Sequence, residues 1–134
     1  MTPFAGQNRS SLRRQWRDAW GRYRTGAPLD PLQASLVTVI AAHPEHQPCM
    51  DSDTADGADV AFLHLGLHLA LREQLVTDRP AGIRTVQQTL EARGMDAHAA
   101  EHCMIEVLAN TLWESQQAGS LPDERRYLRE LQSL

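Results

Sequence analysis

The stretch that decides the fold is Val60-Ala61-Phe62-Leu63-His64-Leu65-Gly66-Leu67-His68-Leu69-Ala70-Leu71. It is apolar on almost every side of a helix, a pattern typical of a helix that is buried among others. We expect this helix to cover residues 59–78 and to be the most buried element of the chain. It carries two histidines in its apolar middle, which is an unusual place for them.

Further helices are predicted on both sides of this stretch. Apolar residues recur at three- and four-residue spacing, and start and stop signals such as Asp30 before Pro31, and Gly119, bound the segments. No alternating strand pattern stands out. The sequence therefore predicts an all-α fold, a single-domain bundle of about five helices plus a short C-terminal helix. The expected helices cover residues 10–23, 31–42, 59–78, 83–92 and 96–118, with a short tail helix beyond residue 122.

Length and composition restrict the class of protein. The chain has 134 residues, of which 42 % are hydrophobic and 22 % charged, so one globular domain is expected over residues 1–134. We expect residues 1–9 to be flexible and residues 44–57 to form an acidic surface loop. Neither a membrane-spanning stretch nor a signal-peptide pattern is apparent, and two cysteines are too few for a disulfide framework. A cytoplasmic protein without a membrane partner is the expectation.

Charge is unevenly distributed along the chain. Residues 1–25 carry six arginines against one aspartate, whereas residues 30–60 carry six acidic residues and no basic one. A basic first helix can contact phosphate, but no Gly-rich or other nucleic-acid motif accompanies it. We therefore expect the basic helix to pair with the acidic segment, and nucleic acid is not the favoured partner.

The histidines point to a metal site. His64 and His68 lie one turn apart on one face of the central helix, and buried imidazoles need hydrogen-bond partners or a metal ion. The helix over residues 96–118 repeats the spacing with His98, His102 and Glu106. Imidazole and carboxylate ligands suit zinc or iron. The predicted ligands of a divalent zinc or iron ion are His64, His68, His102 and Glu106, with His43 as an additional candidate.

Other interpretations of these residues stay open. The histidines can be structural, bonded to Glu106, Thr111 or backbone carbonyls, in a non-enzymatic module that binds a protein partner or forms a homodimer. His43, His46 and Cys49 recur at three-residue intervals and could serve a metal of their own. Haem held by paired histidines is a third possibility. Whether the protein is an enzyme is left open.

Several segments of the chain together form a recognisable pattern. They are Phe62-Leu63-His64-Leu65-Gly66-Leu67-His68-Leu69-Ala70-Leu71-Arg72-Glu73-Gln74, Asp78-Arg79-Pro80-Ala81-Gly82-Ile83-Arg84, Ala100-Glu101-His102 with Met104 and Glu106, Leu112-Trp113-Glu114, and Trp20, Tyr23 and Gly26. In these segments the chain resembles an uncharacterised bacterial family, domain of unknown function 1841. The resemblance covers residues 13–127, and the double-histidine stretch is its most specific part.

The chain departs from the family pattern after the second helix. The family pattern there resembles His-Pro-Glu-aromatic-His, whereas this chain has His43-Pro44-Glu45-His46-Gln47, so His43 is kept and the second histidine has moved or been lost. The resemblance implies a small His-rich helical protein and no established activity.

Overall fold

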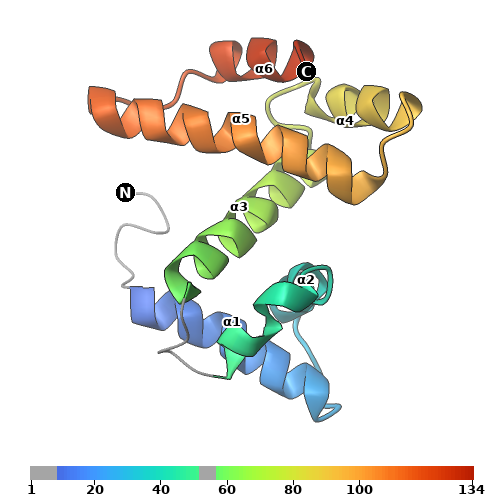
Figure 1. Cartoon of the computed structure of the whole chain (residues 1–134), viewed down its shortest axis with the longest axis vertical. Coiled ribbons are helices and arrows are strands. Elements are labelled where there is room, and N and C mark those ends of the chain that lie inside the picture. The colour runs from blue at the N-terminus through green and yellow to red at the C-terminus, as the bar shows by residue number, and fades with distance from the viewer. Residues whose placement is uncertain (1–8, 52–56) are drawn as a thin grey trace. The chain divides into compact units, whose positions relative to one another are not determined.

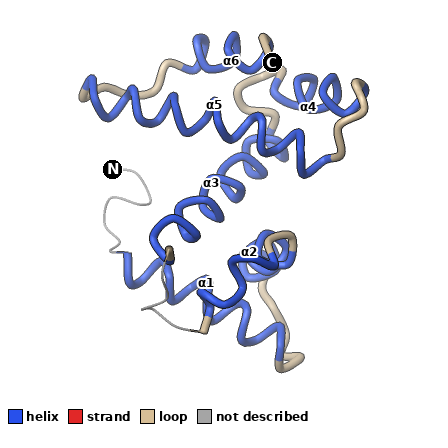
Figure 2. The backbone as a smooth tube through the Cα atoms, in the orientation of Figure 1, coloured by secondary structure: helices blue, strands red, loops and turns tan. Residues whose placement is uncertain are grey.

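A computed structural model describes residues 9–51 and 57–134 of the chain. The predicted flexible segment, apart from residue 9, and part of the predicted acidic loop lie outside these residues. Within the described residues the backbone forms helices joined by short connections and contains no strand, which confirms the all-α prediction (Figure 2). The helices are α1 (Arg9–Arg24), α2 (Pro31–Ala41), the 3-10 helix η1 (Pro44–Met50), α3 (Ala58–Thr77), α4 (Ile83–Ala92), α5 (Ala97–Ala118) and α6 (Glu124–Gln132).

The described part of the chain divides into two compact units. The first unit is Met1–Gly66 and the second is Leu67–Leu134, so the boundary falls inside α3. Each unit has buried apolar side chains of its own. The N-terminal half of α3 contributes to those of the first unit, and the C-terminal half to those of the second. None of the helices in the described ranges is long and apolar enough to cross a membrane.

In the first unit, α1 packs against α2 and both contact η1. The α2 helix begins as predicted, because the Asp30 carboxylate accepts a hydrogen bond from the Gln33 backbone N–H and the Gln33 side chain accepts one from the Asp30 N–H. Leu32 in the first turn is 49 % exposed, since the buried face of α2 forms in its later turns. The buried apolar side chains of this unit include Trp16, Ala19, Trp20, Leu36, Val37, Val39, Ile40, Cys49, Met50, Ala61, Phe62 and Leu65.

The prediction of a surface loop after α2 is wrong for the first half of that segment. Pro44–Met50 forms the 3-10 helix η1, and its last two residues, Cys49 and Met50, are buried. Proline fixes φ near the helical value, so the two prolines of this segment favour a short tight helix. Although the segment is polar on average, its C-terminal end therefore belongs to the core of the first unit.

The basic α1 pairs with the acidic segment, as predicted. Arg24 Nη2 lies 2.7 Å from Asp51 Oδ1, and Arg13 forms an ion pair with Asp59. The guanidinium carbons of Arg13 and Arg17 lie 5.2 and 5.3 Å from the centre of the Phe62 ring. These arginines therefore serve the internal packing of the first unit.

In the second unit, α4 and α6 lie along the same side of α5 and contact each other (Figure 1). Asp96 caps α5 by accepting a hydrogen bond from the Ala99 N–H, and Gly119 ends it in the left-handed conformation. The C-terminal half of α5 is less buried, and its Trp113 is 60 % exposed. The core comprises Leu71, Ile83, Val86, Leu90, Ala100, Met104, Ile105, Leu108, Tyr127 and Leu131.

The α3 helix, predicted to be the most buried element, is buried along only part of its surface. Leu65, His68 and Leu71 are fully buried, but Val60 and Leu63 are 69 % and 65 % exposed. The buried residues follow one another at three-residue spacing, the spacing of a stripe along one side of a helix. The helix is therefore covered over part of its circumference.

Candidate metal centre

The six histidines of the chain fall into two clusters, three in each unit. In the second unit, His68 of α3 meets two residues of α5, His98 and His102. We call these three residues the α5 histidine cluster. In the first unit, His43, His46 and His64 contact one another, and we call them the η1 histidine cluster.

The α5 histidine cluster has the dimensions of a site that can hold a metal ion. Its ring centres lie 4.9 Å apart for His68 and His102, 5.4 Å for His68 and His98, and 4.2 Å for His98 and His102. One ring nitrogen from each residue lies within 4.8 Å of those of the other two. Nitrogens bound to one tetrahedral zinc ion are about 3.3 Å apart, given a Zn–N bond of about 2.0–2.1 Å. The three imidazoles therefore form a group that could hold a metal ion.

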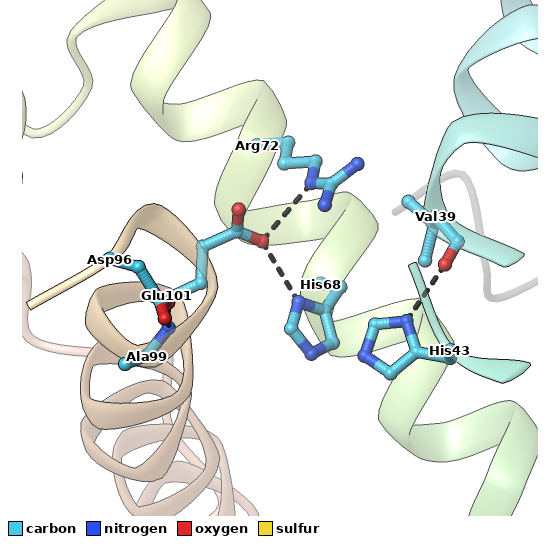
Figure 3. Close-up of polar contacts among 7 residues, drawn as sticks. All are labelled: Val39, His43, His68, Arg72, Asp96, Ala99 and Glu101. Carbon is cyan, nitrogen blue, oxygen red and sulfur yellow. Dashed lines mark hydrogen bonds and ion pairs between the residues drawn. The ribbon is translucent and has the colours of Figure 1, made fainter. Parts of the chain in front are cut away.

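A buried carboxylate orients the central histidine. His68 Nδ1 donates a hydrogen bond to Glu101 Oε1 over 2.8 Å, and Arg72 Nε donates to the same oxygen over 3.1 Å (Figure 3). Because Nδ1 then carries the proton, the lone pair of neutral His68 is on Nε2. A carboxylate on the far nitrogen is the usual outer partner of metal-binding histidines, since it fixes the ring and increases its basicity.

The electrostatics favour the protonation states that a metal requires. Burial lowers the pKa of His68 by disfavouring the imidazolium, against the opposite effect of the Glu101 hydrogen bond. Burial alone would raise the pKa of Glu101, but the hydrogen bonds from His68 and Arg72 outweigh it and the pKa is lowered. At neutral pH the pair therefore consists of a neutral imidazole and an ionised carboxylate.

Glu106, the carboxylate predicted as a ligand, is exposed on α5, and among the described residues it is not part of the group that could hold an ion. Each four-residue step turns a helix by about 400°, so Glu106 is rotated about 80° from His98. Glu101 takes the buried position instead. Its spacing of three, four and seven residues from Met104, Ile105 and Leu108 puts it on the apolar stripe of α5, and a charged residue on such a stripe was the available signal.

His98 was noticed in the sequence for its spacing from His102 but was not among the predicted ligands. The structure brings it onto the His68 and His102 rings, because positions four apart on α5 share a face. His68 and His102, which were predicted, lie in this cluster as well. His43 and His64 belong to the first unit, and the ligand roles predicted for them stay predictions.

The first unit orients His43 in a similar way. Its Nδ1 donates a hydrogen bond to the Val39 carbonyl oxygen over 2.7 Å, and the side chain is fully buried.

The two cysteines, Cys49 and Cys103, are both free thiols. The backbone oxygen of Cys49 accepts a hydrogen bond of 3.4 Å from Arg17.

Comparison with known proteins identifies the family. The chain matches the domain of unknown function DUF1841 over residues 8–133 and therefore belongs to this family, as the sequence resemblance indicated. No curated protein and no solved structure matches the chain.

Proposed function

We propose that this protein binds a divalent transition-metal ion in its second unit, through His68, His98 and His102. The observation that carries the proposal is the Glu101 carboxylate on Nδ1 of His68, since it fixes the ring in the tautomer with the lone pair on Nε2 and makes the ring a better donor. His98 and His102 supply two further imidazoles from successive turns of α5.

The donor set favours zinc, with iron as the second choice. Three neutral imidazoles without a thiolate suit zinc, copper, nickel and iron, and three protein ligands around a four-coordinate zinc ion leave one position for water. A site with an open position can support metal-assisted chemistry. Within the second unit, Arg72 holds the Glu101 carboxylate in place and so positions His68 indirectly.

The test is the metal content of the full chain, measured by mass spectrometry on protein purified without a chelator or a histidine tag. We expect the double variant His98→Ala/His102→Ala to hold one ion fewer per chain than the parent. Glu73→Gln, an exposed carboxylate on α3, is the matched control and should keep the parent content. Equal metal content in the double variant and the parent, after reconstitution under reducing conditions, would reject the proposal.

The alternative function is a protein-interaction module with structural histidines. Val60 and Leu63 favour it, because these apolar side chains lie three residues apart on α3 and are more than half exposed. In this case we expect a homodimer or a complex with a protein partner, and a chelator should leave the melting temperature unchanged. A monomer by sedimentation together with a metal-dependent melting temperature would favour the metal site instead.

We further expect the protein to work in the bacterial cytoplasm, where its two cysteines would stay reduced. Detection of both thiols with a maleimide reagent in freshly lysed cells tests this expectation. A disulfide between Cys49 and Cys103 would contradict it.

A further inference from the structure

We propose that the first unit holds a second divalent-metal site, formed by the η1 histidine cluster of His43, His46 and His64. This site uses none of the residues assigned to the α5 histidine cluster. The two sites therefore have no assigned ligand in common.

The spacing of the three rings fits a common ion. Their centres are 5.0 Å apart for His43 and His64, 5.6 Å for His46 and His64, and 5.9 Å for His43 and His46. Imidazoles bound through one nitrogen to a tetrahedral zinc ion have centres about 5.2 Å apart, because the centre lies about 1.1 Å beyond a nitrogen that is about 2.0–2.1 Å from the metal. The observed distances lie close to this value before any ion has drawn the rings together.

The 3-10 geometry of η1 explains why two of the rings lie together. A 3-10 helix has three residues per turn, so side chains at positions i and i+3 are eclipsed. His43 is the residue directly before η1, and His46 follows three residues later, where its backbone N–H donates to the His43 carbonyl oxygen over 3.0 Å. The two rings are nearly parallel, with an angle of 18° between their planes. In an α-helix the same two positions would be rotated apart by about 60°.

His43 is held as a metal ligand is usually held. Its Nδ1 proton is donated to the Val39 carbonyl oxygen, so the neutral ring has its lone pair on Nε2 (Figure 3). A backbone carbonyl is one of the standard outer partners of a metal-binding histidine. His64 approaches His43 edge-on from α3, with an angle of 81° between the two planes.

An acidic side chain lies beside the cluster. Glu45 Oε1 is 4.0 Å from His46 Nε2. A carboxylate beside three imidazoles supplies an oxygen that can become the fourth ligand of a divalent cation.

Calorimetric titration of the tag-free, metal-stripped full chain with Zn²⁺ tests the second site. We expect the parent to bind two equivalents. His46→Ala/His64→Ala should lose one of them, and His98→Ala/His102→Ala should lose the other. Glu73→Gln again serves as the control, and far-ultraviolet circular dichroism verifies that each variant is folded. If the double variant in the first unit does not fold, the single variant His46→Ala replaces it, since His46 is only partly buried in a short helix.

The outcomes separate the two proposals. Two equivalents in the parent and one in the His46→Ala/His64→Ala variant support the second site. The second site is overturned if the His46→Ala/His64→Ala variant binds as many equivalents as the parent. If the His98→Ala/His102→Ala variant binds as many equivalents of Zn²⁺ as the parent, the site proposed for the second unit is rejected. The site at the η1 histidine cluster is not affected by that result.

Discussion

At the scale of single residues, Glu101 orients His68 in the α5 histidine cluster. Its side chain is almost completely buried, and one of its oxygens accepts hydrogen bonds from both His68 and Arg72. A buried carboxylate without such partners would be strongly destabilising. Burying this carboxylate in the apolar stripe costs desolvation free energy. A role in orienting His68 explains why a charged residue occupies the position.

Replacing Glu101 tests this role directly. We expect Glu101→Gln to weaken zinc binding at the α5 histidine cluster about 10- to 100-fold, because the amide lacks the charge that makes His68 a strong donor. Competition with a chromophoric chelator measures the change in affinity. To observe this site alone, the measurement is made in the His46→Ala/His64→Ala background.

Glu106→Gln discriminates between the two carboxylates in the same assay. Glu106 is exposed, so we expect parental zinc affinity for this variant. A large loss in Glu106→Gln with little change in Glu101→Gln would show that the ligand set predicted from the sequence is the right one.

Tyr127 should make the free energy of unfolding depend on pH, whether or not a metal is bound. Its hydroxyl donates to Gln74 Oε1 over 2.7 Å, and burial raises its pKa above the ordinary value of 10.0. Above pH 10 the unfolded chain therefore loses the phenolic proton while the folded chain retains it. The contribution of Tyr127 to the free energy of unfolding should fall as the pH rises beyond that point. Urea unfolding at mildly and strongly alkaline pH measures it, and Tyr127→Phe should show a smaller fall than the parent.

At the scale of single elements, local signals located the helices well. The Asp30 cap with Pro31 predicted the start of α2, the segment at residues 83–92 matches α4, and Gly119 predicted the end of α5. Caps and turns depend on residues within a few positions of one another, which is why the sequence suffices for them. The helix η1 was missed because its burial depends on Cys49 and Met50 reaching the core of the first unit.

The cap of α2 is open to a stability test. Asp30→Ala removes the acceptor for the Gln33 N–H and half of the capping box, so we expect the free energy of unfolding to fall by about 1 kcal/mol. Urea denaturation followed by circular dichroism measures the change. Asp30→Ser retains a capping oxygen and should recover most of it; equal stability of all three proteins would show that the cap contributes nothing.

For the whole molecule, the division into two compact units within α3 is the main feature that the sequence did not indicate. The double-histidine stretch crosses the boundary, with His64 in the first unit and His68 in the second. Histidines that look like one pair in the sequence therefore contact different neighbours, His43 and His46 in one case and His98 and His102 in the other.

Metal binding should stabilise the whole chain. An ion that binds only the folded form adds about 2.7 kcal/mol to the free energy of unfolding at a free concentration 100 times the dissociation constant. We expect Zn²⁺ to raise the melting temperature and a chelator to reverse the effect. Calorimetric scans of the parent with and without Zn²⁺ measure it. A chain without histidines at positions 46, 64, 98 and 102 should show no response, and a melting temperature that is the same with and without Zn²⁺ in the parent would contradict both metal sites.

The sequence by itself determined that the chain is all-α, where most helices begin and end, and that its histidines are concentrated in apolar surroundings. It also predicted the pairing of the basic α1 with acidic residues, because opposite charges in excess on neighbouring segments attract whatever the detailed geometry. Only the tertiary structure decided which histidines meet and that Glu101 rather than Glu106 is buried with His68. Such contacts depend on the rotation of α3 and α5 about their axes, and this rotation is set by packing between residues that are far apart in the chain.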